Sequence, residues 1–218
     1  PADGFPLMQP EVDGICLELE QNQLRKLLEK TAFAMAQHDV RYYLNGLLFE
    51  VRPGGLTAVA TDGHRLAKVE IDCGSDVTEV TQVILPAKTV SELKRLLVGT
   101  DDMTRIRISE RTIQLQMGET QVTSKLIDGR YPEYDRVIPR NPDRLAVADR
   151  SALRQALTRT AILSNEKYKG VRVTFDAGVL RLQAHNPEQD EAEEELELEY
   201  GGEATTIGFN VSYVMDIL

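Results

Sequence analysis

The chain has 218 residues, of which 42% are hydrophobic, and its formal net charge is −10 at pH 7. This length and composition allow one large domain or two ordinary ones with a packed core, which excludes a fibre or a disordered tail. No apolar run approaches the ~20 residues that span a bilayer, the N-terminus lacks a signal-peptide pattern, and the two cysteines fit a reducing compartment better than a disulfide scaffold. We therefore expect a cytoplasmic protein without a membrane partner, in which Cys16 and Cys73 are small buried side chains.

The first part of the chain is predicted to be a linker, a strand and a helix. Residues 1–12 are rich in proline and lack periodicity, which predicts an extended linker. Alternation over residues 14–20 predicts a half-buried strand, and apolar spacing over 21–36 predicts an amphipathic helix. A strand, a hairpin turn and the β-branched run that holds residues 60–67 follow.

The same order of elements then repeats, at a period of roughly 60–67 residues. Helices are predicted over 86–97 and 150–163, and another begins at Val211. Period-two alternation and β-branched runs predict strands at residues 47–51, 83–85, 105–108, 113–117, 122–126, 145–147, 171–175, 180–184, 196–200 and 206–210. The last copy stops at Leu218 before its strands, so we expect a fragment that is cut inside its final domain.

This pattern predicts an α+β fold, in which repeated strand-helix-strands units place their helices on one face of antiparallel sheets. The turn signal Asn141-Pro142-Asp143 marks the expected domain boundary. We therefore expect a linker at 1–12, a complete domain at 13–140 and a partial domain at 141–218.

The predicted helices differ in charge from the rest of the chain. They hold nine basic residues and two acidic ones, a net charge of +7, whereas the remainder carries −17. Lysine and arginine on the outer face of an amphipathic helix are ordinary solvation, which is one explanation. The other is that all three helices face one polyanion, and the bias to a single sign favours it.

Several segments carry a resemblance to a known family. The Asp62-Gly63 pair taken alone is typical of a tight turn between two strands. Together with other segments it resembles the bacterial sliding clamp, the beta subunit of DNA polymerase III. The segments that carry this resemblance are 39–46, 60–67, 128–134, 161–167 and 208–213.

The resemblance implies the DNA-clamp fold and a closed ring of two crescent-shaped subunits with three domains each, in which basic helices line the hole. It implies a DNA polymerase processivity factor, a non-catalytic accessory subunit that encircles double-stranded DNA without reading its sequence. As a homodimer, such a clamp tethers the DNA polymerase III catalytic subunit, the clamp loader, other polymerases and repair proteins through a pocket for short apolar motifs. This chain then corresponds to the middle domain and the first part of the C-terminal domain.

The resemblance also assigns site residues. A partner-peptide pocket needs apolar walls and a few fixed polar groups, and it is assigned to Leu44, Thr61, Gly63, His64, Arg65, Leu66, Pro132, Tyr134, Arg136 and Val137. DNA contact is assigned to His38, Arg41, Tyr42 and Tyr43. The alternative for the two adjacent tyrosines is packing in the core or in a turn. The family's remaining pocket wall comes from its C-terminus, so we expect the pocket to be incomplete.

An acidic run at residues 188–195 has three possible explanations. Consecutive acids are usually a solvated face, and carboxylates can also hold a metal. The resemblance implies that this run contacts a basic strand of the other subunit. It also implies that two apolar residues, Ile162 and Leu163, take part in the same contact. The alternative for these two residues is ordinary packing at a helix end. The dimer interface is thus assigned to Ile162, Leu163, Glu188, Asp190, Glu191, Glu193 and Glu194.

The sequence contains no recognisable catalytic constellation. The three histidines lie far apart without zinc-ligand spacing, and neither a nucleophile elbow nor a phosphate-binding glycine-rich loop is present. We therefore expect no cofactor and no metal. The competing hypothesis is a phosphate-handling enzyme that uses the carboxylates of 188–195 with a divalent metal, and the absence of metal-ligand spacing counts against it.

Overall fold

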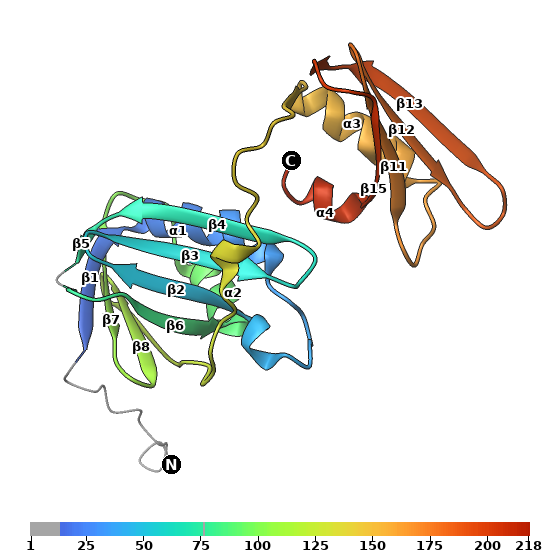
Figure 1. Cartoon of the computed structure of the whole chain (residues 1–218). Coiled ribbons are helices and arrows are strands. Elements are labelled where there is room, and N and C mark those ends of the chain that lie inside the picture. Colours follow the sequence, from blue (N-terminus) through green and yellow to red (C-terminus); the bar gives the residue numbers. More distant parts are fainter. Residues whose placement is uncertain (1–13, 76) are drawn as a thin grey trace. The chain divides into compact units, whose positions relative to one another are not determined.

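The structure, a computed structural model, describes residues 14–75 and 77–218 (Figure 1). The expected linker at 1–12 lies outside the described residues. The chain divides into two compact units, Pro1–Tyr134 and Asp135–Leu218, and each unit has its own hydrophobic core. The sequence predicts the boundary at the Asn141-Pro142-Asp143 turn, and the division between the units lies a few residues before that turn.

The first unit contains two antiparallel sheets that contribute to one core. The five-stranded sheet has the order β5-β1-β7-β8-β9 and the four-stranded sheet the order β4-β3-β2-β6. The strands of the larger sheet are β1 (Ile15–Glu20), β5 (Gly74–Ser75), β7 (Met103–Ile108), β8 (Thr112–Met117) and β9 (Thr120–Lys125). Those of the smaller sheet are β2 (Gly46–Arg52), β3 (Gly55–Thr61), β4 (Leu66–Asp72) and β6 (Thr81–Pro86). Side chains of β7 and β8 alternate between core and surface, as predicted.

Two helices cover one face of the four-stranded sheet, α1 (Gln21–Thr31) and α2 (Ala87–Leu96). The first packs against β3 and β4, and the second against β2 and β6. Leu24, Leu27 and Leu28 of α1 are fully buried, so the predicted apolar stripe is confirmed.

The helix predicted over 21–36 is wrong in its last part. The α-helix ends at Thr31, and a short 3-10 helix, η2 (Ala32–Ala34), follows it. Thr31 lies outside the helical backbone region at φ −122°, and its hydroxyl donates to the carbonyl oxygen of Leu27 at 2.7 Å. A threonine that bonds to the preceding turn in this way bends or ends a helix, which apolar spacing alone does not reveal.

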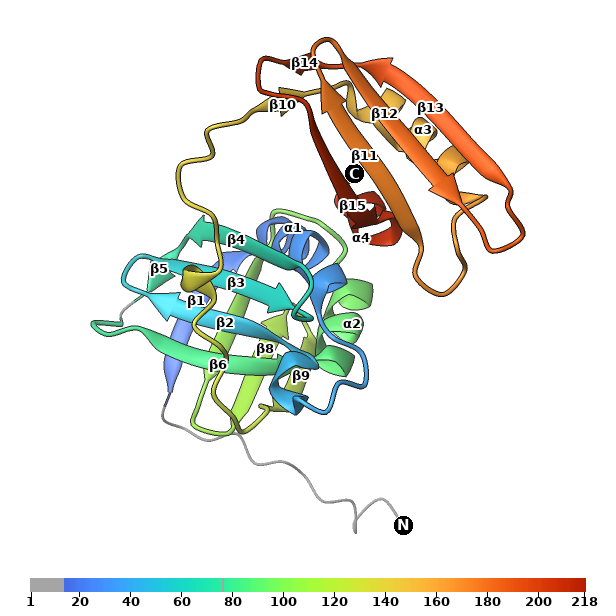
Figure 2. The ribbon, with the colours of Figure 1, turned by 45° about the vertical axis from the view of Figure 1, so that its right-hand side comes forward.

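The segment that follows β9 crosses the four-stranded sheet on the face opposite the two helices (Figures 1 and 2). The amide of Ile127 donates to the carbonyl oxygen of Ile84 on edge strand β6 at 2.9 Å, and the Tyr134 hydroxyl donates to Glu50 on β2 at 3.1 Å. The segment leads into another short 3-10 helix, η4 (Tyr134–Arg136). Because both faces of the sheet are covered, β3 is buried at six of its seven residues, and Thr57 is the one polar side chain among the six.

The second unit is a four-stranded antiparallel sheet of order β13-β12-β11-β15 with two helices. Its strands are β11 (Gly170–Asp176), β12 (Val179–His185), β13 (Glu191–Glu197) and β15 (Thr205–Asn210), and a short separate pair is formed by β10 (Ala146–Val147) and β14 (Glu199–Tyr200). Helix α3 (Arg150–Ala161) packs against β12 and β13, and α4 (Val211–Met215) packs beside β15. Leu157, Val171 and Leu182 lie in the core of this unit.

The strand predicted at 196–200 corresponds to the end of β13 and to β14, which are separated at Leu198, so it is confirmed only in part. β13 already begins at Glu191 within the acidic run and ends at Glu197. It forms a strand because it pairs along its whole length with β12 and because basic side chains neutralise some of its carboxylates. Arg181 on β12 bonds to Glu195 at 2.6 Å, and Arg159 on α3 bonds to Glu194 at 2.5 Å.

Two further sequence expectations concern the cysteines and membranes. The expected burial of Cys16 is wrong: this residue is exposed, because it alternates along β1 with Leu17, which points into the core. Cys73 is half-buried, and this burial raises the pKa of its thiol. Within residues 14–75 and 77–218, no helix has both the length and the apolar character needed to cross a membrane.

Candidate nucleic-acid and partner-binding sites

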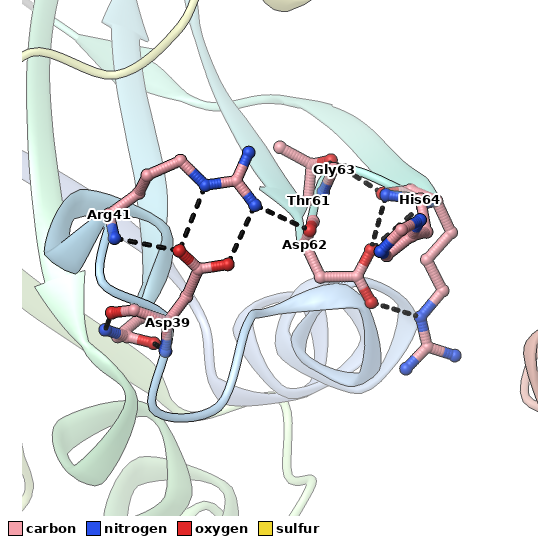
Figure 3. Close-up of polar contacts among 8 residues, drawn as sticks. Asp39, Arg41, Thr61, Asp62, Gly63 and His64 are labelled. Carbon is pink, nitrogen blue, oxygen red and sulfur yellow. Dashed lines mark hydrogen bonds and ion pairs between the residues drawn. The ribbon is translucent and has the colours of Figure 1, made fainter. Parts of the chain in front are cut away.

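We call residues 62–65, which connect β3 to β4, the Asp62 turn (Figure 3). The Asp62 carboxylate accepts hydrogen bonds from the backbone amides of His64 and Arg65 at 2.9 and 3.0 Å. Gly63 has φ +87°, a backbone conformation that glycine adopts without strain. The predicted tight turn at Asp62-Gly63 is therefore confirmed, with its shape fixed by its own side chains.

Arg65 ties the Asp62 turn to the segment after α1. Its guanidinium donates to the carbonyl oxygen of Phe33 at 2.7 Å, lies 5.5 Å from the centre of the Phe33 ring, and pairs with Asp62 at 3.2 Å. Its side chain is only 16% exposed. The guanidinium therefore supports the turn and leaves little of its surface open to a ligand.

Arg41 joins the turn to the loop that carries the predicted DNA contacts, residues 38–43. Its Nε and Nη2 atoms donate to the two carboxylate oxygens of Asp39 at 3.0 and 2.7 Å (Figure 3). Nη2 also donates to the carbonyl oxygen of Asp62 at 3.3 Å. A methyl group on Gly63 would lie 3.2 Å from the guanidinium nitrogens, so the arginine lies against the turn.

The hydrogen bonds from Arg41 hold the pKa of the Asp39 carboxyl at about 2, below its ordinary 3.8. Any stability that the pair contributes is thus present above pH 4 and is lost as the pH falls through 2. We expect the Asp39 carboxyl carbon to titrate near pH 2 by NMR, and near 3.8 in the Arg41→Gln variant. The control is Arg95→Gln, which removes an exposed arginine paired elsewhere with Glu92 and should leave Asp39 unchanged; an Arg41→Gln titration still near pH 2 would contradict the assignment.

The side chains of the 38–43 loop, whose last residues open the short 3-10 helix η3 (Tyr42–Leu44), are displayed to different extents. His38 is exposed at φ +58°, and Tyr42 is 56% exposed, which excludes core packing for that tyrosine. Tyr43 is half-buried, and its ring packs edge-on against the Tyr42 ring, with 5.7 Å between the two ring centres. The Asn45 side chain closes the loop, because it accepts from the Asp39 amide at 2.9 Å and donates to the Asp39 carbonyl oxygen at 2.8 Å.

The predicted pocket residues of the first unit fall into open and buried groups. Leu44 and Tyr134 are 2% and 5% exposed, so they lie beneath the surface. Pro132 is exposed on the segment that crosses the sheet, and Leu66 is half-buried at the start of β4. The remaining predicted members of the first unit are Thr61 at the end of β3 and Gly63, His64 and Arg65 in the Asp62 turn. Arg136 ends η4, and Val137 after it is 69% exposed.

The helices keep the positive charge that the sequence assigns to them. Within the part of the chain that the structure describes, three of their basic residues form ion pairs, those of Arg25 with Glu29, Arg95 with Glu92, and Arg159 with Glu194. The other six have no acidic partner within 4.0 Å among the described residues; they are Lys26, Lys30, Lys88, Lys94, Arg150 and Arg154. These six are exposed, so each unit presents basic helix surface in an acidic chain.

The predicted dimer residues of the second unit lie directly after α3, in β13 and in the turn before that strand. Ile162 is 76% exposed, which excludes helix-end core for this residue, and Leu163 is half-buried. β13 is the outermost strand of its sheet, and its residues Glu191 and Glu193 are exposed. Glu194 differs, because both of its carboxylate oxygens bond to Arg159 and hold α3 to the strand. Glu188 and Asp190 are exposed in the preceding turn.

Two models of one protein family match this chain. The family model described as DNA polymerase III beta subunit, central domain, matches residues 18–133, and the model of its C-terminal domain matches 135–218. The chain belongs to the DNA polymerase III beta subunit family. The predicted family and α+β clamp fold are therefore confirmed.

Curated members of the family cover the whole chain. It is 50% identical to the beta sliding clamp of Pseudomonas putida and 47% identical to that of Escherichia coli, over 218 residues in both cases. The chain spans 59% of the length of each of these relatives.

Solved structures of the family have the same fold. A DNA polymerase sliding clamp from Pseudomonas aeruginosa, crystallised with a ligand, gives a TM-score of 0.97 at 50% identity, and another from that organism, bound to griselimycin, gives 0.95. The beta subunit of Thermotoga maritima gives 0.91 at 29% identity. Each comparison covers 100% of this chain and 59% of the other.

The carboxylates of the acidic run are spread over β13 and the turn before it. Among the described residues, no three His, Cys, Asp or Glu side chains are grouped so that they could hold a metal ion. Successive glutamates of β13 point to opposite faces of the sheet, so neighbours in sequence cannot converge on one ion.

The residue assignment made by resemblance omits Tyr131. This side chain is 3% exposed, and its phenol oxygen accepts a hydrogen bond from the backbone amide of Thr61 at 3.0 Å. Burial raises the pKa of Tyr131 to about 12, which keeps the phenol neutral over the physiological range. The only sequence signal for it is its position in a segment that carries the family resemblance, because no local pattern predicts a partner 70 residues away.

Proposed function

We propose that this chain acts as part of a sliding clamp, a ring that encircles double-stranded DNA and keeps a DNA polymerase on its template. The observation that carries the proposal is 50% identity, over the full length of the chain, with a protein named beta sliding clamp. The basic helix surfaces of both units support it, because they supply the phosphate contacts that such a ring needs in an otherwise acidic chain.

The proposed role is non-catalytic. Contacts with phosphates give affinity without dependence on base sequence, and a protein that slides needs this, because base readout would hold it at preferred sites. The proposed contacts are the helix lysines and the exposed side chains of the 38–43 loop, including His38, Arg41 and Tyr42, with Tyr43 beside them. A clamp of this family would do this work on the bacterial chromosome, in the cytoplasm.

The Asp62 turn and Pro132 are proposed to bind short apolar motifs of the polymerase catalytic subunit, the clamp loader and repair proteins. Such a site needs apolar surface and a few fixed polar groups, which Leu66 and Pro132 supply together with His64. The griselimycin-bound clamp of Pseudomonas aeruginosa supports ligand binding by this fold. Arg136 and Val137 remain predicted members of the pocket.

The acidic edge of the second unit is proposed to bind a second copy in the complete ring. An edge strand offers unpaired backbone groups to another strand, and Glu191 and Glu193 beside it would attract a basic surface. Ile162 would supply apolar contact area in the same interface. Glu194 is proposed to support the edge through Arg159 and not to contact the partner directly.

Duplex binding tests the proposal. We expect weak binding of a fluorescent DNA duplex, equal for unrelated sequences, with an affinity that falls steeply as salt rises. Reversing Lys26 and Lys30 on α1 to glutamate should weaken binding at every sequence. It should also reduce the slope of log affinity against log salt by about two, because each of the two lysines would no longer neutralise a phosphate.

The matched control for the duplex experiment is the double reversal of Arg111 and Lys125 to glutamate. Both are exposed basic residues of the same unit that lie outside the helices. The change in net charge is the same in the two double variants, so a general electrostatic effect would weaken both equally. Equal losses of affinity, or binding that is insensitive to salt, would refute DNA contact by the helix surface.

A further inference from the structure

Tyr131 occupies the point where the segment that crosses the sheet meets the end of β3. The paired residues of β2 and β3 end at Leu48 and Val59, two positions before Thr61. Beyond that point β2 provides no paired residue for the backbone of β3, and the Tyr131 phenol oxygen accepts the Thr61 amide hydrogen instead. A buried side chain thus extends the hydrogen bonding of the sheet to the base of the Asp62 turn.

Thr61 passes this constraint into the turn. Its hydroxyl donates to the carbonyl oxygen of Arg65 at 2.7 Å and accepts from the Gly63 amide at 3.1 Å. Its backbone position therefore affects the turn at Gly63 and at Arg65, since the two hydrogen bonds depend on where the threonine side chain lies. Any displacement of Thr61 would move the surface formed by Gly63 and His64.

The same phenol also fixes the segment that carries Pro132. Two tyrosines attach this segment to the sheet, Tyr131 through Thr61 and Tyr134 through Glu50, and exposed Pro132 lies between them. The Tyr134 ring lies 5.4 Å from the Lys68 ammonium on β4, which gives this end a second contact. Tyr131 is thus the nearer of the two attachments to the Asp62 turn.

We propose that Tyr131 is a positioning residue for the partner-binding pocket, which sets Pro132 at a fixed distance from the Asp62 turn by accepting the Thr61 amide hydrogen. This inference rests on the proposed partner-binding function. The pocket then has two walls from segments about 70 residues apart in sequence, and the Tyr131–Thr61 hydrogen bond links the segment of one wall to the base of the other. A ligand that spans both walls binds best when their separation is set in advance, because it need not order them itself.

The test is Tyr131→Phe, which removes the phenol oxygen and keeps the buried ring. We expect two changes in the full 218-residue chain. Without ligand, hydrogen exchange of the Thr61 amide should accelerate by about tenfold, since its acceptor is gone. Griselimycin, used as the probe, should bind about fivefold to tenfold more weakly, measured at a temperature where both proteins are fully folded.

The matched control is Tyr200→Phe in the second unit, which also removes a phenol that bonds to the backbone, there to the Glu203 carbonyl oxygen at 2.8 Å. It should leave griselimycin affinity unchanged. A merely structural role for Tyr131 would lower the melting temperature and leave the affinity intact, and that result would overturn the proposal, as would unchanged exchange at Thr61.

Amide shifts of the parent protein separate this inference from the proposed function. Griselimycin should perturb the amides of Gly63 and Leu66 in the parent chain. If it binds elsewhere, the partner-binding function fails and the inference about the pocket fails with it, whereas the exchange rate of Thr61 still reports on the hydrogen bond. If it perturbs these amides and Tyr131→Phe binds as tightly as the parent, only the inference is refuted.

Discussion

Replacement of Pro132 by aspartate is expected to weaken griselimycin binding by about 30-fold, equivalent to about 2 kcal/mol. Pro132 is exposed on the segment that crosses the four-stranded sheet, in one of the two proposed walls of the pocket. An aspartate there would reduce the apolar area that meets the ligand and place a carboxylate without a partner against an apolar group. Fluorescence or NMR titration of the folded variant measures the effect.

An exposed position makes Pro132→Asp a clean test, because surface substitutions usually change stability by less than about 0.5 kcal/mol. The matched control is Pro187→Asp, an exposed proline of the second unit that lies in none of the proposed pocket walls. Griselimycin affinity should be the same in the control and the parent. Equal affinities for Pro132→Asp and the parent would remove Pro132 from the pocket.

Phe49→Ala is expected to destabilise the first unit by about 3–5 kcal/mol. Phe49 is fully buried on β2, where it pairs with Ala58 on β3 and Val83 on β6. The variant would lose the transfer free energy of the ring and leave a cavity in a core to which both sheets contribute. Urea unfolding, monitored through the NMR signals of β2 and β3, measures the stability of this unit specifically. A unit-specific probe is needed because a chain of two units need not unfold in one step.

Val98→Ala is the control for the core variant. Val98 is 68% exposed in the same unit, so its truncation removes little buried area and should change stability by less than about 0.5 kcal/mol. A destabilisation below about 1 kcal/mol for Phe49→Ala would show that the core adjusts around the missing ring. It would contradict the close packing of β2 between its neighbouring strands.

Sequence patterns located the elements whose structure depends on neighbouring residues. The helix beginning at Gln21 and the alternating strands β7 and β8 were predictable because their apolar periods match their own backbone geometry. The end of α1 was not, since Thr31 terminates it through a side-chain hydrogen bond to Leu27. The first residues of β13, 191–195, were missed because paired charges, and few apolar residues, accompany its strand structure.

In the candidate sites, too, some features follow from neighbouring residues and others depend on tertiary packing. Asp62 and Gly63 predict their own turn, because a short carboxylate and a residue without Cβ suffice to form it. Family resemblance drew attention to Tyr42 and Leu44 alike, but only the packing shows that Tyr42 is exposed and Leu44 is 2% exposed. Burial depends on segments remote in sequence, so no local pattern could distinguish the two.

By itself the sequence determined the repeated strand-helix-strands order, the positive charge of the helices and the Asp62 turn, since each follows from residues close together in the chain. Only the tertiary structure decided what holds that turn in place. Arg41, from a segment before β3, donates a hydrogen bond to the carbonyl oxygen of Asp62. Tyr131, from a segment after β3, accepts a hydrogen bond from the Thr61 amide. Such contacts form only when the sheet and the segment that crosses it have folded together, because a hydrogen bond requires two groups within about 3 Å, whatever their separation in sequence.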